Sequence, residues 1–189
     1  MAIIDYFVKN FEGAGTKEIS AHVISFIALG VAFLVYMLKK RSHIILAKLM
    51  TDAAYAVHFI LLGQFTAASV NTVNIGRGIV FYNRGSKKWA SSNLWCVFFV
   101  VVTLGCAVFT WRGPISLMPT VGSSLAVIGT WSTNTLVLRS FNLAGVSLWF
   151  VYSILAFSPA SMICNAIYIV TLIISIVREI IERTKAKSA

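Results

Sequence analysis

Five polar residues stand out among those inside long apolar runs of this sequence. They are Asp52, His58 and Arg77, with Asn74 and Asn165. Polar groups inside apolar runs are costly to bury unless they meet a partner or a ligand, so these positions are candidates for binding. The set offers an imidazole, a fixed cation, a carboxylate and two amides that both donate and accept hydrogen bonds. Such groups suit the recognition of a polar solute.

Asp52 and Arg77 are predicted to lie at similar depth on neighbouring antiparallel helices. At 1.5 Å per residue, Asp52 is about 12 Å and Arg77 about 9 Å from the same ends of their helices. On one hypothesis, Arg77 binds an anionic or strongly polar solute and Asp52 holds the arginine in place. The alternatives are a structural ion pair between the two residues, or a guanidinium that reaches the aqueous boundary.

The asparagines are predicted to hydrogen-bond a solute. Asn74 lies about 14 Å deep, where its amide must bond either a solute or another helix. We favour the solute because Asn165 stands at an equivalent position in a second, similar stretch of sequence. Asn71, one helical turn from Asn74, extends the same face.

Three ring-bearing side chains complete the candidate site: His58, Trp149 and Tyr152. His58 can relay protons, because an imidazole ordinarily titrates near physiological pH, or it can stay neutral and hydrogen-bonded. Trp149 and Tyr152 can stack on a solute or simply pack between helices.

The stretches 55–83 and 148–178 share one plan. In each, an apolar run with a ring-bearing side chain leads through a short turn to a second run with an asparagine. The ring and the asparagine are 16 residues apart in both: His58 with Asn74, and Trp149 with Asn165. A repeat indicates architecture before detail. We therefore expect a helical hairpin that occurs twice, with the two copies facing each other around a solute path.

The composition places the chain in lipid. Of its 189 residues, 58% are hydrophobic and only 12% are charged, and its mean hydropathy is +0.84. Soluble domains are about 25% charged, and a small soluble protein needs more polar cover than this. The net charge of +10 comes from short basic clusters between apolar runs. That pattern is typical of cytoplasmic loops of an inner-membrane protein, so we expect no nucleic-acid partner.

Signatures of enzymes and metal sites are missing from the sequence. The three cysteines lie inside apolar runs without close spacing, as buried apolar side chains do. The sequence has no His or Cys cluster at metal spacing, no G-x-S-x-G and no phosphate-binding glycine loop. We expect neither catalysis, nor a cofactor, nor a metal.

Seven membrane-spanning helices are predicted, each near the roughly 20 residues that cross a bilayer. They are placed at 17–38, 44–63, 66–83, 89–110, 117–136, 139–157 and 159–181. Residues 17–83 and 117–181 would form two triple-helix bundles with 89–110 as a linker helix. Residues 1–16 are expected to form an interfacial helix or a frayed terminus, and 182–189 a basic cytoplasmic tail. Arg139 marks the break between the fifth and sixth spans.

The charges orient the seven spans. The loops after the first, third and fifth spans, the tail and Lys48 together hold twelve Lys and Arg residues, against three on the other side. Because basic loops stay in the cytoplasm, the amino end is predicted outside and the carboxyl end in the cytoplasm. With a linker between them, both bundles would stand in the same sense, as in parallel repeats.

Short motifs resemble the bacterial YgjV-type inner-membrane proteins. They are His58-Phe-Ile-Leu-Leu-Gly63, Asn74-Ile-Gly-Arg77 and Leu117-Met-Pro-Thr-Val-Gly122, with Trp131. That family looks like a relative of the SWEET, SemiSWEET and PnuC transporters, which have a 3+1+3 helix plan. The resemblance implies that a ring residue and an asparagine of each bundle line the solute pocket: His58 with Asn74, and Trp149 with Asn165.

The sequence departs from the SWEET pattern in three ways. It lacks the Pro-Gln pair of the PQ-loop relatives, its first bundle has no proline, in contrast to Pro119 in the second, and His58 stands where a tryptophan is usual.

The function we expect is facilitated or ion-coupled transport of a small polar solute by alternating access. The pocket would lie between the second, third, sixth and seventh spans. The alternative is a non-transporting receptor or assembly protein that uses its basic tail. The sequence leaves open whether copies associate into a homo-oligomer.

Overall fold

The computed structural model describes residues 15–35 and 41–188, which form seven α-helices and two short 3-10 turns. The helices are α2 (Thr16–Val35), α3 (Arg41–Leu61), α4 (Phe65–Asn83), α5 (Leu94–Phe109), α6 (Leu117–Trp131), α7 (Thr135–Leu155) and α8 (Pro159–Ser188). The 3-10 turns are η1 (Lys88–Ser91) and η2 (Pro114–Ser116). The all-helical prediction is confirmed. The helix expected at 1–16 lies outside the described residues, except for Gly15 and Thr16.

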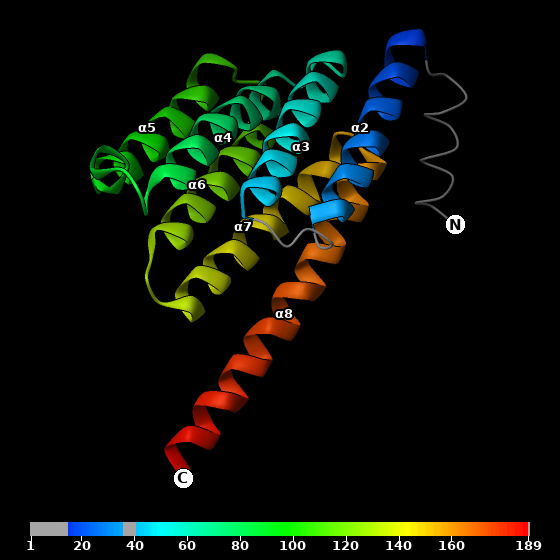
Figure 1. Ribbon diagram of the computed structural model, residues 1–189. Coiled ribbons are helices and arrows are strands. Elements are labelled where there is room, and N and C mark those ends of the chain that lie inside the picture. The colour runs from blue at the N-terminus through cyan, green and yellow to red at the C-terminus, as the bar shows by residue number, and fades with distance from the viewer. Residues whose placement is uncertain (1–14, 36–40, 189) are drawn as a thin grey trace.

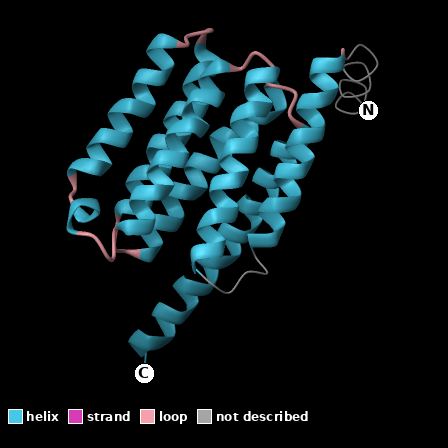
Figure 2. Ribbon diagram, turned by 45° about the horizontal axis from the view of Figure 1, so that its top comes forward, coloured by secondary structure: helices cyan, strands magenta, loops and turns pink. Residues whose placement is uncertain are grey.

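The helices pack side by side in two consecutive groups (Figures 1 and 2). In the first group α3 packs against α2 and α4, and in the second α7 packs against α6 and α8. The groups also meet where α2 packs against α8 and where α4 packs against α6. Helix α5 packs against α4 and α6 at the edge of the bundle, and the carboxyl-terminal part of α8 projects beyond it (Figure 1).

Two turns of the same backbone form connect α3 to α4 and α7 to α8. Gly63 and Phe157 both have left-handed backbones, with φ of 68° and 49°. The N–H of Gln64 donates to the Phe59 carbonyl at 2.7 Å, and the N–H of Ser158 donates to the Ser153 carbonyl at 2.9 Å. Such a left-handed residue just after the last helical residue satisfies the carbonyls that a helix end leaves unpaired.

These turns shift the predicted correspondence between the two stretches. Helices α3 and α7 are both 21 residues long, and their first and last residues, like the two left-handed residues, are 94 positions apart. The asparagine-to-asparagine match made from the sequence implies 91. At the spacing of the turns, His58 corresponds to Tyr152 rather than to Trp149. Likewise, Asn71 rather than Asn74 corresponds to Asn165.

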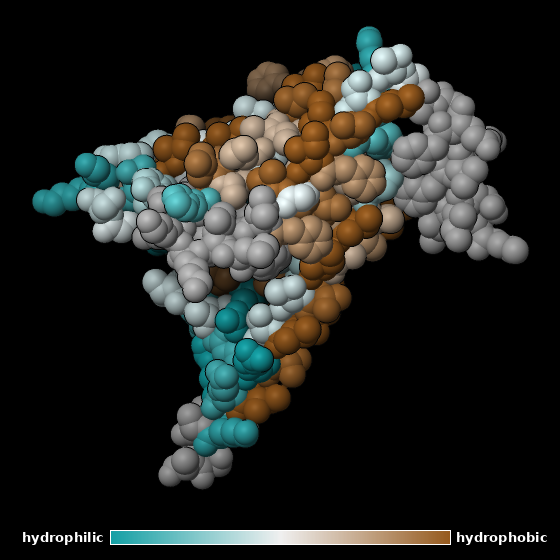
Figure 3. All heavy atoms as spheres, turned by 45° about the vertical axis from the view of Figure 1, so that its right-hand side comes forward, coloured by the Kyte–Doolittle hydropathy of each residue, from teal (hydrophilic) through white to brown (hydrophobic). Residues whose placement is uncertain are grey.

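Large apolar side chains cover the outside of the bundle. Figure 3 shows them as a brown surface that continues along one edge of the projecting part of α8, opposite a hydrophilic edge. Three described helices are long and apolar enough to cross a membrane, through Thr16–Phe33, Thr135–Leu155 and Pro159–Lys185. Helix α5 is as apolar but shorter, α3 and α4 carry charged residues, and α6 has only 15 residues.

Three predicted boundaries are wrong. Helix α5 begins at Leu94 after the separate turn η1, instead of at residue 89. Helix α6 ends at Trp131, and α7 begins after Asn134, whose side-chain oxygen accepts a hydrogen bond from the Leu136 N–H at 3.0 Å. Arg139 therefore lies inside α7 and marks no break, because an asparagine N-cap starts the helix earlier.

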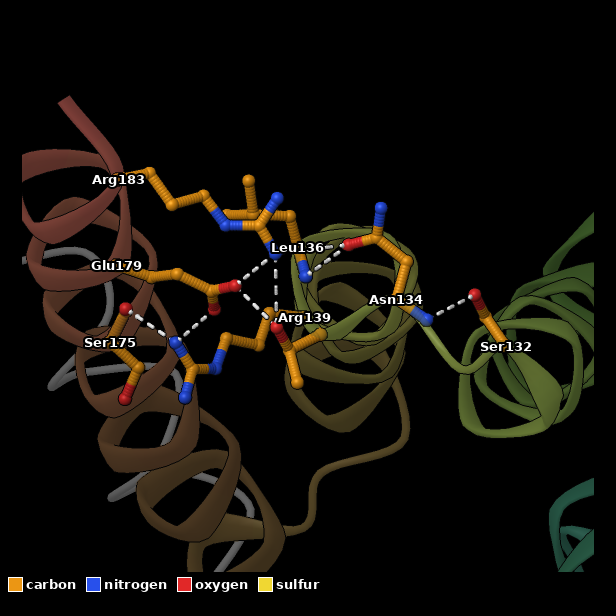
Figure 4. Close-up of polar contacts among 8 residues, drawn as sticks. Ser132, Asn134, Leu136, Arg139, Ser175, Glu179 and Arg183 are labelled. Carbon is orange, nitrogen blue, oxygen red and sulfur yellow. Dashed lines mark hydrogen bonds and ion pairs between the residues drawn. The ribbon is translucent and has the colours of Figure 1, made fainter. Parts of the chain in front are cut away.

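The segment predicted as a basic tail continues α8 as far as Ser188. It contains no glycine or proline, so nothing in its sequence ends the helix. An ion pair one turn apart, 2.7 Å between Arg183 Nη2 and Glu179 Oε1, supports the helix where it leaves the bundle (Figure 4). Glu179 also meets Arg139 of α7 at 2.5 Å.

Helices α6 and α7 cross at a pair of glycines. A methyl group on Gly122 would lie 2.7 Å from the carbonyl oxygen of Gly145, and one on Gly145 would meet the Gly122 carbonyl oxygen. Gly122 therefore permits the close approach of the two helices. Gly76 has only ordinary contact, since the nearest neighbour of a methyl group there would be a Phe99 ring carbon at 3.9 Å.

Candidate functional site

A cavity of about 170 Å³ lies between α3, α4 and α6. Its lining consists of Lys48, Leu49, Asn74, Arg77, Gly78, Phe81 and Thr130. Gly78 allows α3 to approach α4 here, because a methyl group at this position would lie 2.8 Å from a Leu49 methyl carbon. We call this the arginine cavity. The pocket was predicted between α3, α4, α7 and α8, whereas the arginine cavity has α6 as its third wall.

Two of the predicted site residues meet in the arginine cavity. Arg77 and Asn74 are both buried, with 9% of each residue exposed, and they stand one helical turn apart on α4. Arg77 Nη1 has no hydrogen-bond partner among the described residues. The Asn74 amide likewise makes no side-chain hydrogen bond within the described part of the chain. A buried donor such as Arg77 Nη1 is usually satisfied, so a ligand or water is expected to meet it.

Asp52 and Lys48 provide the other charges near Arg77. They stand one turn apart on α3, where Lys48 is exposed and Asp52 half-buried. The carboxylate is close enough to interact electrostatically with both cations. It forms no direct ion pair with Arg77, since the ion pairs found in residues 15–35 and 41–188 are those of Glu179. The alternative of a direct structural pair is thus not what the structure shows.

His58 lies at the opposite end of the bundle from the α6–α7 connection, next to the turns at 62–64 and 156–158. We call this the hairpin end. The imidazole is fully buried, and both its nitrogens are bonded. Nδ1 donates to the carbonyl of Ala21 on α2 at 2.7 Å, and Nε2 is 2.7 Å from Ser158 Oγ in the α7–α8 turn. His58 thus joins α3 to both α2 and the second group of helices.

A second bond crosses between the groups in the opposite direction. The Tyr152 hydroxyl of α7 donates to Gln64 Oε1 in the α3–α4 turn at 3.1 Å. At the spacing of 94 residues, Tyr152 corresponds to His58 and Ser158 to Gln64. The two bonds are therefore the same contact made reciprocally, a ring of each group reaching the turn of the other. We call this pair the hairpin-end lock.

Aromatic rings fill the space beside the lock. Phe59 lies between the two groups, with its ring centroid 5.8 Å from that of Tyr152 and 6.1 Å from that of Trp149. The Trp149 indole N–H donates to Ser123 Oγ of α6 at 3.1 Å. Trp149 and Tyr152 are thus engaged in packing between helices and line no part of the arginine cavity.

The two remaining asparagines bond to other residues of the helix bundle, one between helices and one within its own helix. Asn165 Nδ2 donates to Ser153 Oγ of α7 at 3.0 Å and lies 3.4 Å from Ser161 Oγ. Asn71 Nδ2 donates to the Ala67 carbonyl one turn before it at 2.8 Å. The structure therefore brings Asn74 and Arg77 together, with Asp52 near them, and places His58, Trp149, Tyr152, Asn165 and Asn71 elsewhere.

Four polar residues of these two sites, Lys48, Thr130, Gln64 and Ser158, are not among the predicted site residues. Lys48 was counted only as a charge near a helix end, and Thr130 was passed over inside an apolar run. In the sequence, Gln64 and Ser158 stand in the two predicted turns. The sequence does carry a signal for Gln64 and Ser158. Each is a polar residue in the turn between a helix with a buried ring-bearing side chain and the helix that follows it. Among the described residues, no group of three or more His, Cys, Asp or Glu could hold a metal ion.

Comparison with known proteins identifies one family. Residues 19–183 match the Imp-YgjV family, described as bacterial inner membrane protein. The match covers nearly the whole described chain. No curated protein and no solved structure matches the chain.

Proposed function

Because the chain belongs to this family and is therefore, as its sequence predicted, a bacterial inner-membrane protein, we propose that it transports a small polar solute by alternating access. Two bundles, α2–α4 and α6–α8, would rock against each other, with α5 as the linker between them. The matched contacts support this 3+1+3 plan: α2 packs on α8 as α4 packs on α6. The resemblance to SWEET, SemiSWEET and PnuC transporters is part of the proposal.

The observation that carries the proposal is the difference between the two ends of the bundle. At the hairpin end, the lock and the rings beside it join the two bundles. Toward the other end, the arginine cavity lies between α3 and α4 of one bundle and α6 of the other. This arrangement is expected of a carrier in one of its two conformations. The hairpin-end lock would be the closed gate, and the arginine cavity would be the polar pocket beyond it.

The basic loops then give the direction. Arg84, η1 and the α6–α7 connection lie at the end opposite the lock, and this end holds most of the positive charge. If basic loops mark the cytoplasm, the lock faces outward and the arginine cavity is nearer the cytoplasm. The proposal assigns no chemical reaction and no cofactor to the chain.

The test is whether the two ends of the bundle are open to water in turn, so that one is accessible when the other is closed. In a variant with Cys96, Cys106 and Cys164 replaced by alanine, Ala68→Cys reports the hairpin end and Thr130→Cys the arginine cavity. A membrane-impermeant thiol reagent should label Thr130→Cys when it is applied to inverted vesicles, and it should leave Ala68→Cys unlabelled when it is applied to right-side-out vesicles.

Weakening the lock should reverse this result. Tyr152→Phe combined with Ser158→Ala removes both crossing bonds but keeps the rings, so labelling of Ala68→Cys should rise while that of Thr130→Cys falls. Tyr82→Phe, an exposed tyrosine near the far end of α4, is the matched control and should change neither. If Ala68→Cys becomes accessible and Thr130→Cys does not change, the two ends are not coupled and alternating access is wrong.

The projecting part of α8 favours a second candidate, a receptor or assembly protein. Its charged and apolar edges would together offer a contact surface for another protein (Figure 3). Truncation of the chain after Arg178 distinguishes a transporter from a receptor or assembly protein. A transporter should keep its reciprocal accessibility, whereas an assembly protein should lose its binding partner in cross-linking from membranes.

A further inference from the structure

The charges of the arginine cavity point to the class of solute. We propose that the cavity binds a small oxyanion, a monocarboxylate or inorganic phosphate, as the solute that the protein carries. This inference rests on the proposed transport function and assigns Arg77 and Asn74 as the residues that hold the anionic group.

The local charge balance is positive. Lys48 and Arg77 line the cavity, and Asp52 is the carboxylate in electrostatic contact with them. Two cations against one anion leave about one positive charge uncompensated inside an apolar helix bundle, where isolated charge is expensive. Lys48 is exposed and can extend its ammonium toward water, whereas Arg77 is buried and its Nη1 has no hydrogen-bond partner in the described part of the chain. An anion in the cavity would satisfy that donor.

The fold itself does not need these charges. At the spacing of 94 residues, Lys48, Asp52 and Arg77 correspond to Asn142, Val146 and Thr171 of the second bundle. That bundle packs the same helices together with uncharged residues at all three positions. Charges required for helix packing would be expected at these matching positions in both bundles, so a charge cluster found at them only beside the cavity indicates a binding role.

The size of the cavity limits the ligand. At about 170 Å³ it is well below the roughly 300 Å³ at which pockets begin to take drug-sized molecules. A nucleotide or disaccharide does not fit this conformation, whereas a carboxylate with a few carbons does. The planar guanidinium of Arg77 can bond two oxygens of one anion, and the Asn74 amide can bond a third oxygen or a hydroxyl group.

Thermal unfolding of the purified full-length protein in neutral detergent tests the proposal. The probes are sodium formate, acetate, lactate and phosphate, each compared with sodium chloride at equal ionic strength. At least one probe should raise the melting temperature by several degrees in a saturable way, because a ligand that binds only the folded state stabilises it. Arg77→Gln should lower the affinity for that probe at least tenfold. Arg77→Lys, which keeps the charge without the two-pronged donor, should give an intermediate loss.

The control is Arg112→Gln, which removes an arginine from the hairpin end, where it lies over the Phe65 ring. This variant should keep the full response. The proposal is overturned if no probe stabilises the wild type, or if Arg77→Gln responds fully. If Arg77→Gln does not fold, the melting-temperature shifts of Arg77→Lys and Asn74→Leu with the same probes test the proposal instead.

A second arm separates a soluble anion from a lipid headgroup. If phosphatidylglycerol micelles stabilise the protein through Arg77 and none of the soluble probes does, the anion is a headgroup and the assignment as solute is wrong. Binding is read here without transport, so the outcome is independent of the accessibility test. A bound anion with no reciprocal gating would support the site while refuting the carrier.

Discussion

Asn74 and Asn165 are chemically identical but have opposite roles in the structure. Asn165 is bonded across to α7 through Ser153, while Asn74 lines the arginine cavity and makes no side-chain hydrogen bond to a described residue. The sequence could identify both as polar groups in apolar runs. It could not tell which one would meet a serine of a neighbouring helix, because that depends on how α7 and α8 are rotated against each other.

The same substitution should therefore have different effects at the two positions. Asn165→Leu removes an interhelical hydrogen bond and should lower the unfolding free energy by about 0.6 kcal/mol, with roughly 1.7 kcal/mol as an upper bound. Asn74→Leu breaks no hydrogen bond within the described residues and should leave stability nearly unchanged. Denaturation in mixed detergent micelles measures both. Equal losses would show that Asn74 has a structural partner.

The tautomer of His58 follows from its two contacts. A carbonyl can only accept, so Nδ1 carries the hydrogen that bonds Ala21, and in the neutral ring Nε2 accepts from the Ser158 hydroxyl. A proton added to Nε2 would force Ser158 to turn from donor to acceptor. One side of the hairpin-end lock is thus sensitive to a proton, and the Tyr152 side is not.

His58→Phe should destabilise the protein more than Ser158→Ala. The first leaves both the Ala21 and the Ser158 groups without their partner, at about 1–3 kcal/mol for unsatisfied buried groups, while the second removes a single bond. Thermal melts of both variants, with Ser86→Ala at an exposed turn as control, measure the difference. If Ser158→Ala lowers the melting temperature as much as His58→Phe does, the hydrogen bond from His58 to Ala21 of α2 contributes nothing to stability.

At the scale of helices, turn signals predicted the hairpins well, and side-chain caps were missed. Gly63 and Pro159 marked the two turns in the sequence because one tolerates a left-handed backbone and the other starts a helix. Asn134 carried an equally physical signal as an N-cap. Arg139, a charge in an apolar stretch, carries a competing signal for a loop, and that signal predicts the wrong boundary. In the structure Arg139 instead donates to the Ser175 carbonyl at 2.8 Å.

The crossing of α6 and α7 depends on its two glycines. Gly145→Ala should lower stability by about 1–3 kcal/mol, because the methyl group can be accommodated only if two backbones move apart. Gly30→Ala is the matched control: a methyl group there meets nothing within 4 Å, and alanine favours a helix over glycine. Gly30→Ala should thus be neutral or stabilising in the same thermal melt. A tolerated Gly145→Ala would show that the helices can separate freely.

The ion pairs of Glu179 tie the start of α7 to the emerging part of α8 (Figure 4). Glu179 accepts from Arg139, Arg183 and Thr135. Glu179→Gln should speed amide hydrogen exchange in α8 after Arg178, and the effect should shrink as salt is added, because exposed charges are screened. Glu182→Gln, an exposed acid one turn away from Arg178 with no ion pair among the described residues, is the control. Unchanged exchange in Glu179→Gln would show that α8 holds this helical end by itself.

At the scale of the whole molecule, the sequence indicated two similar hairpins but matched them three residues out of register. That match rested on asparagines, which are side-chain types. The backbone turns that define the correspondence were visible only once their hydrogen bonds were known. The corrected spacing matters because it pairs His58 with Tyr152 and Gln64 with Ser158, and so makes the lock a reciprocal contact.

The orientation in the membrane decides what the arginine cavity can receive. In the cysteine-free background, Glu182→Cys near the end of α8 should react with an impermeant reagent only after spheroplasts are opened. Lys17→Cys, near the start of α2, should react in intact spheroplasts. Both positions are exposed, so a difference between them reports sidedness rather than burial. The reverse result would turn the lock toward the cytoplasm, and a solute would then enter the arginine cavity from outside.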